Sequence, residues 1–137
     1  MKNNDIPTLR RRIHIMKKAK RNKEINLERE LLHLNHLRKD FKKMHEEIYL
    51  SRQDYLNTLN LNITARTSED RRGFEVAENY LDHLKDKIHG LISKYNSISE
   101  KLNAQKDKVK RYKVGIEKIE DLVKNLSYKL HFLNNER

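Results

Sequence analysis

Basic side chains gathered near the N-terminus are the densest group of residues with the chemistry to bind a ligand. Residues 1–23 hold nine Lys and Arg against one acid, Asp5, so this N-terminal basic segment carries +8 of the net charge of +11. Clustered cations attract phosphates and carboxylates. The segment is therefore expected to bind an acidic protein surface, nucleic acid or anionic lipid, unless it is a solvated face without a ligand. Its cations are Lys2, Arg10, Arg11, Arg12, Lys17, Lys18, Lys20, Arg21 and Lys23.

The residues around these cations favour one of the alternatives. No Phe, Tyr or Trp lies within residues 1–23. Proteins that bind single strands interleave aromatic side chains with their cations, and the segment also lacks a recognised nucleic-acid motif. We therefore favour the carboxylates of a protein partner as its ligand, and we expect neither nucleic acid nor a small-molecule substrate.

Residues with catalytic or metal-binding potential are scattered. His33 and His36 have the i, i+3 spacing that allows two imidazoles to share a metal ion on a helix, but no carboxylate completes a set of ligands and the chain has no cysteine. Gly73, Gly90 and Gly115 are isolated and form no phosphate-binding loop, and no Ser-His-Asp arrangement is supported. We expect no metal, no cofactor and no enzymatic activity.

The composition predicts the elements that position these residues. The chain has 137 residues, 37% of them charged, with only 3 Gly and 1 Pro. Because a compact domain of many elements needs turn residues between them, this composition favours long helices. No stretch approaches the roughly 18 apolar residues of a membrane span, so a soluble cytoplasmic protein is expected.

The second half of the chain carries the most regular pattern. Alternate steps of three and four residues, beginning at Phe74, reach 18 positions of which only Gln105 is plainly polar. A 3-4 repeat of this length predicts a left-handed coiled coil whose seam faces a partner helix. The positions are Phe74, Ala77, Leu81, Leu84, Ile88, Leu91, Tyr95, Ile98, Leu102, Gln105, Val109, Tyr112, Ile116, Ile119, Val123, Leu126, Leu130 and Leu133.

The first half has a less regular seam. Leu34, Leu37, Phe41, Met44, Ile48, Tyr55 and Leu59 fit one register, with Ser51 as its polar member. Leu27 and Leu31 require a shift of register, and Lys20, Lys23 and Glu24 interrupt the stripe that begins at Leu9, Ile13 and Met16. Pro7 suits a first helical turn, so the first helix is expected over about residues 7–60.

The segment between the two patterns is rich in Asn and Thr, which lower helix propensity. Thr67 and Asp70 have the spacing of a capping box that opens the second helix. A single coiled-coil domain over residues 1–137 is therefore expected, with a turn at about 61–67 and a second helix over about 68–133. This is an all-α, two-helix antiparallel coiled-coil hairpin. The alternative is one continuous rod that dimerises in parallel.

A turn at about 61–67 has a consequence for the C-terminal residues. It places residue i opposite a residue near about 129 minus i, so the second helix outruns the first. The seam of residues 121–137 would then lack an internal partner, and an unpartnered apolar stripe implies an external one. The terminal end of the hairpin is therefore the expected docking end.

The pattern resembles the FliJ/YscO-type stalk proteins of type III secretion systems, and its Lys, Asn and Ile content suits the EscO branch. The likeness covers nearly the whole chain and rests on the basic opening Leu9–Ile13 with Lys17 and Lys18, and on the residues around the turn. The latter are Leu56, Asn57, Leu59, Asn60, Ile63, Thr64, Ala65, Arg66, Thr67 and Ser68, followed by Ala77, Leu81, Leu84 and Ile88.

The resemblance implies a fold like the γ subunit of rotary ATPases and a non-enzymatic role in protein transport and virulence. The protein would lie in the cytoplasm, at the inner-membrane secretion apparatus. Its partners would be the hexameric secretion ATPase, the cytoplasmic domain of the export gate and secretion chaperones. The residues implied to enter the ATPase pore are Arg10, Arg11, Arg12, Lys17, Lys18, Leu126, Leu130 and Leu133. Those implied to contact the export gate are Tyr55, Leu59, Ala77, Leu81, Leu84 and Ile88.

The residues alone leave two other functions open. The chain could be a coiled-coil scaffold or adaptor of another complex. It could also be a basic protein that binds nucleic acid or a membrane surface, in which case binding would weaken steeply with salt and depend on residues 1–23 alone.

Overall fold

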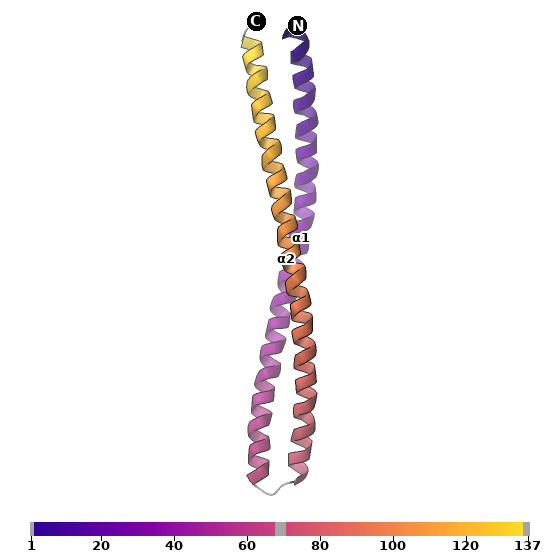
Figure 1. The fold of residues 1–137 in the computed structure, drawn as a ribbon, viewed down its shortest axis with the longest axis vertical. Coiled ribbons are helices and arrows are strands. Elements are labelled where there is room, and N and C mark those ends of the chain that lie inside the picture. Colours follow the sequence, from indigo (N-terminus) through magenta and orange to yellow (C-terminus); the bar gives the residue numbers. More distant parts are fainter. Residues whose placement is uncertain (1, 68–70, 136–137) are drawn as a thin grey trace. The chain divides into compact units, whose positions relative to one another are not determined.

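The chain folds into two long helices that pack against each other as an all-α helical hairpin (Figure 1). The computed structural model describes residues 2–67 and 71–135, with side chains described for residues 5–63 and 72–135. Helix α1 spans Lys2–Thr67 and helix α2 spans Arg71–Asn135. The expected all-α, two-helix antiparallel hairpin is confirmed.

The seam expected in the second half is confirmed position by position. Each of the 18 residues of the 3-4 repeat is buried or half-buried, from Phe74 to Leu133. Gln105, its polar member, is 7% exposed. A seam buried over its whole length means that α2 is held by its partner helix rather than by helix propensity alone.

The seam of α1 is more regular than expected. A single 3-4 register runs without a break from Ile6 to Asn62, and all of its 17 positions except Lys23 are buried or half-buried. The expected shift of register at Leu27 and Leu31 was wrong, because Leu27 fits the single register and Leu31 lies beside it. Lys20 and Lys23 interrupt the apolar stripe as polar members of the seam, whereas Glu24 lies outside it. The register also continues through Thr58 and Asn62, whereas Leu59 lies half-buried beside the seam.

Both ends of α1 differ from the sequence-based expectation. Residues 61–67, expected as the turn, are helical, and helix begins at Lys2 rather than near Pro7. Burial explains both differences, since Asn62 is 3% exposed and Ile6 is 4% exposed. Packing against α2 outweighs the low helix propensity of the Asn- and Thr-rich segment. Thr67 ends α1, and Asp70, the other half of the expected capping box, lies outside the described residues.

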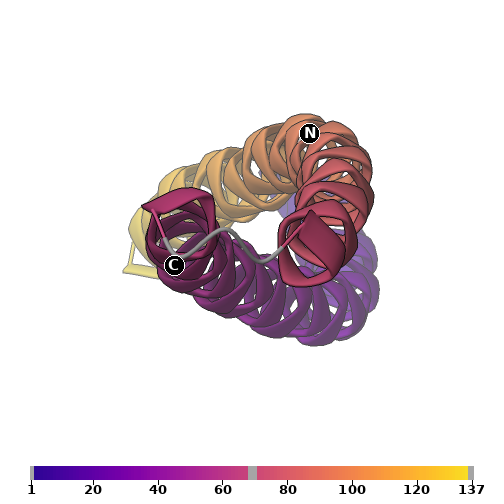
Figure 2. The same ribbon diagram turned by 90° about the horizontal axis from the view of Figure 1, so that it is seen from below.

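The packing divides into two units. Unit 1 consists of residues 1–34 with residues 104–137, and unit 2 consists of residues 35–103. In unit 2 the seam contains the rings of Phe41 and Tyr95, with centroids 4.6 Å apart. Figure 2 shows the last turns of α1 beside the first turns of α2 in this unit.

The expected overhang of the second helix does not exist. In unit 1 the residues of α1 from Lys2 onward lie along the C-terminal part of α2, and Lys20 pairs with Glu120. Leu126, Leu130 and Leu133 are half-buried, while Ile6 and Leu9 of α1 are buried. The prediction failed because α1 continues to Thr67, which shifts the pairing of the two helices by several residues.

Candidate functional site

The five cations implied to enter the ATPase pore are all exposed in unit 1. Arg10, Arg11, Arg12, Lys17 and Lys18 lie on α1 outside its seam, and each is solvent-exposed. They follow one another along the outer surface because the seam takes up the residues on either side, Leu9, Ile13 and Met16. This surface can attract carboxylates or phosphates without any change in the helix pair.

Charge is divided unequally between the two units. Residues 1–34 and 104–137 carry 19 Lys and Arg against nine Asp and Glu, a net charge of +10. Residues 35–103 carry 12 Lys and Arg against 11 Asp and Glu, a net charge of +1. The basic character therefore extends to the facing part of α2 and is not confined to the N-terminal basic segment.

A charged groove of about 460 Å³ lies between the helices of unit 1. The Lys20 ammonium donates to Glu120 at 3.2 Å and approaches Glu24 at 3.6 Å, and the bond to Glu120 raises the pKa of Lys20. Lys20 thus remains a cation at neutral pH. The groove is lined by Lys17, Lys20, Arg21, Glu24, Glu120, Val123 and Lys124.

The apolar residues implied to contact the ATPase together with these cations lie in the seam between the helices and not on the outer surface. Leu126, Leu130 and Leu133 belong to the half-buried seam of α2, so their packing is partly used within the hairpin. Tyr128 and Phe132, one helical turn apart, are 64% and 62% exposed. They form an exposed apolar surface on the C-terminal part of α2.

The residues expected to contact the export gate all lie in unit 2, within or beside the seam. Leu81 and Leu84 are 6% and 2% exposed, so a partner reaches them only if the helices separate. The other four are half-buried, namely Tyr55, Leu59, Ala77 and Ile88. Of the six, Ala77 also lines an open groove.

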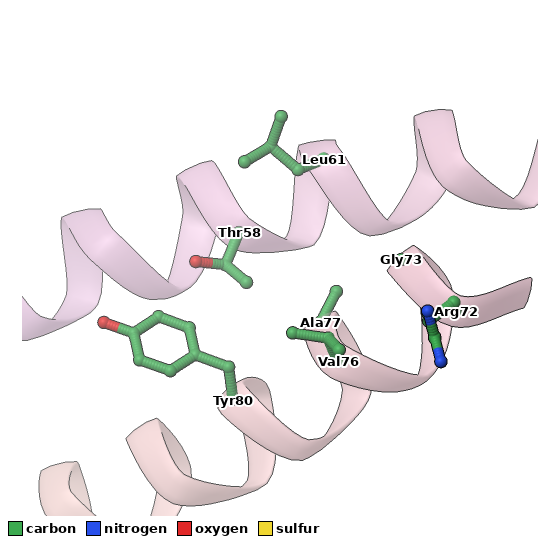
Figure 3. A pocket seen from close by; sticks show the side chains of 7 residues that line it. All are labelled: Thr58, Leu61, Arg72, Gly73, Val76, Ala77 and Tyr80. Atoms are coloured by element: carbon green, nitrogen blue, oxygen red, sulfur yellow. The ribbon is translucent and has the colours of Figure 1, made fainter. Parts of the chain in front are cut away.

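This apolar groove has a volume of about 620 Å³ and lies between α1 and α2 in unit 2 (Figure 3). Small residues form part of it, since Gly73 and Ala77 project little from α2. Leu61 of α1 and Val76 of α2 are 68% and 65% exposed. Its lining consists of Thr58, Leu61, Arg72, Gly73, Val76, Ala77 and Tyr80.

Polar groups lie at the two ends of this groove. Arg72 is at one end and Tyr80 at the other (Figure 3). The Tyr80 hydroxyl donates to Asp54 at 2.5 Å, and this hydrogen bond raises the pKa of Tyr80. The groove can therefore receive an apolar segment while Arg72 offers a charge to a carboxylate at its edge.

Sequence reasoning missed this groove because its walls are off-seam residues. Leu61 and Val76 follow no apolar repeat, and isolated exposed apolar residues are common on any surface. Leu61 and Val76 line one groove only because α1 and α2 pack against each other. A usable signal was the pairing of small residues, Gly73 and Ala77, with bulky neighbours at the start of α2.

No protein-family model, curated protein or solved structure matches this chain. Within residues 2–67 and 71–135, no helix has a segment long and apolar enough to cross a membrane.

Proposed function

We propose that this chain is the non-enzymatic central stalk of a type III secretion system, a FliJ/YscO-like protein that binds two partners. Unit 1 would enter the pore of the hexameric secretion ATPase and stimulate it. Unit 2 would contact the cytoplasmic domain of the export gate. The protein would act in the cytoplasm at the secretion apparatus.

The unequal division of charge is the observation that carries this proposal. A net charge of +10 on unit 1, with Arg10, Arg11 and Arg12 all exposed, suits a ring lined by carboxylates. Long-range attraction of this kind needs no interlocking surface, so the ring's subunits can change conformation around the helix pair.

The apolar groove supports a second, different contact. Unit 2 is nearly neutral and has exposed Leu61 and Val76 beside a groove of about 620 Å³. A partner of unit 2 would therefore bind mainly through apolar burial, with Arg72 as a charged contact at the edge. Two surfaces of unlike chemistry favour two partners over one.

ATP hydrolysis by a purified secretion ATPase, with and without this protein, tests the proposal. We expect the wild type to raise turnover and the triple variant R10E/R11E/R12E to lose most of that stimulation. The matched control is K39E/K42E/K43E, which makes the same change of charge at three exposed positions of unit 2. It should stimulate hydrolysis like the wild type.

Other outcomes would contradict the proposal. If both triple variants lose stimulation equally, the stimulation depends on the net charge of the whole protein and not on the surface of unit 1. If the wild type leaves hydrolysis unchanged but binds duplex DNA or anionic vesicles in a salt-sensitive way, the protein is instead a nucleic-acid or membrane-surface binder.

A further inference from the structure

A polar network interrupts the apolar seam of unit 1. The Gln105 amide donates to the Glu30 carboxylate at 2.6 Å and to the Glu30 backbone carbonyl at 3.0 Å. Lys108 lies 3.2 Å from the other carboxylate oxygen of Glu30. The Glu30 side chain is 16% exposed and Gln105 is 7% exposed. A carboxylate in a helix seam is therefore held by partners on the facing helix.

The apolar seam of α2 does not by itself specify the register in which α2 pairs with another helix. Seventeen of its 18 positions are apolar or aromatic, so α2 alone would pair with any complementary seam in several registers. Apolar contacts at heptad spacing are satisfied again after each shift of seven residues. Apolar burial alone leaves the pairing of α1 with α2 poorly specified.

We propose that Glu30 and Gln105 determine the pairing specificity of this chain, selecting the antiparallel register in which they face each other over slipped registers and over parallel pairing with a second copy. The inference is independent of the proposed function, because it concerns how the hairpin recognises itself.

A slipped register leaves the network unsatisfied. A shift of one heptad places Glu30 near Ile98 or Tyr112 instead of Gln105. The Glu30 carboxylate then loses the amide of Gln105, and Gln105 loses both the carboxylate and the backbone carbonyl of Glu30 as acceptors. A half-buried carboxylate without its donors is disfavoured. The cost falls on the wrong register alone, since in the observed one Glu30 has both Gln105 and Lys108.

Parallel pairing with a second copy is disfavoured in the same way. A parallel α1 pair would bring the two Glu30 carboxylates to the same layer, where like charges repel. A parallel α2 pair would place Gln105 against Gln105 without a carboxylate acceptor. A single polar seam residue is known to fix the register and oligomeric state of coiled coils in this manner.

The test replaces the network with an apolar layer in the full chain, using the variant E30L/Q105L. Spin labels are placed at Arg29→Cys and Lys106→Cys, exposed positions of unit 1 that flank the network, and the chain has no other cysteine. Double electron–electron resonance then reports the distance between the two spin labels. A shift of one heptad moves the helices by about 10 Å along their axes.

We expect one narrow distance distribution for the labelled wild type. For E30L/Q105L we expect a second distance population, or a mass by light scattering that rises with concentration, while helix content by circular dichroism is retained. Retained helix is expected because apolar residues of similar volume usually replace a buried polar pair without loss of stability.

The control variant E30Q keeps a side chain that can hydrogen-bond to Gln105, and it should retain one narrow distance and a monomeric mass. A single narrow distance and a concentration-independent monomer for E30L/Q105L would overturn the proposal. Loss of helix in that variant would overturn it too, since the network would then be needed for folding and not for specificity.

Discussion

The two units share one kind of core and differ in the surface that surrounds it. Both bury a 3-4 seam between α1 and α2, with Leu34 at 3% exposed in unit 1 and Leu84 at 2% exposed in unit 2. Unit 1 carries a net charge of +10 and unit 2 carries +1. The seam therefore holds the two helices together in both units, while the outer residues give each unit a different surface charge.

The polar members of the seam also differ between the units. In unit 1 they include charged residues paired across the helices, as Lys20 is with Glu120 and Glu30 with Lys108. In unit 2 they are small and neutral, and the Oδ1 atom of buried Asn62 has no hydrogen-bond partner within the described residues. Unit 1 thus gains a specific register from its polar layers, whereas unit 2 loses stability to Asn62.

Truncation of the shared seam should have the largest effect. Leu34→Ala in unit 1 and Leu84→Ala in unit 2 should each lower the free energy of unfolding by about 2–5 kcal/mol, because each removes a buried side chain and leaves a cavity. Urea denaturation followed by circular dichroism measures the loss. Leu50→Ala, at an exposed position (64%), is the control and should change it little. A seam residue that behaves like Leu50 would show that its unit lacks a packed core.

Replacement of Asn62 should raise stability. Its Nδ2 atom donates weakly to Glu78 at 3.3 Å, and its Oδ1 atom is buried without a partner. Since an unsatisfied buried acceptor costs about 1–3 kcal/mol, Asn62→Leu should stabilise the protein by about 1 kcal/mol in urea denaturation. Asn57→Leu, at an exposed position of the same helix, should not. An unstable Asn62→Leu variant would mean that the seam of unit 2 needs this amide.

Two helical glycines, Gly90 and Gly115, give a smaller expected effect. A Cβ at Gly90 of unit 2 would have nothing within 4 Å, so Gly90→Ala should stabilise by about 0.8–1 kcal/mol through helix propensity. A Cβ at Gly115 of unit 1 would lie 3.0 Å from the Lys23 ammonium, which must move. Gly115→Ala should therefore stabilise less. Thermal denaturation of both variants checks the order, and a larger gain at Gly115 would contradict it.

The smallest effect concerns pH. The hydrogen bond from Gln105, aided by Lys108, holds the pKa of Glu30 below its ordinary value of 4.5. Because the folded-state pKa is depressed, Glu30 stabilises the hairpin above about pH 4.5, and this contribution is lost as the pH falls through the folded-state pKa. The stability difference between wild type and Glu30→Gln should therefore shrink with acidification. Glu28→Gln, at an exposed position, is the control, and a pH-independent difference for Glu30→Gln would contradict the assignment.

Sequence periodicity was sufficient for the second helix and insufficient for the first. The seam of α2 could be followed from Phe74 to Leu133 because nearly every member is apolar. The predicted seam of α1 was interrupted at Lys20 and Lys23, because a search for repeating apolar residues does not recognise a charged residue as a member of the seam. Those side chains are accommodated only by what faces them, such as Glu120 opposite Lys20 and the space beside Gly115 opposite Lys23.

The error in the turn had a larger consequence for the candidate site. Low helix propensity at residues 61–67 predicted a turn there, but α1 continues to Thr67 because Thr58 and Asn62 are buried against α2. The shifted pairing removed the expected overhang and gave Leu126, Leu130 and Leu133 an internal partner. The exposed cations of the N-terminal basic segment were predictable, since surface charge needs no knowledge of the pairing.

A crossed binding measurement tests most directly whether the two units bind different partners. The purified hexameric secretion ATPase and the export-gate cytoplasmic domain are each titrated with R10E/R11E/R12E, altered in unit 1, and with Val76→Asp, altered in the apolar groove of unit 2. Val76 is 65% exposed, so the change should leave the fold intact. We expect the first variant to lose the ATPase and keep the gate, and the second to do the reverse. Loss of both partners by either variant, or of neither by both, would contradict the division.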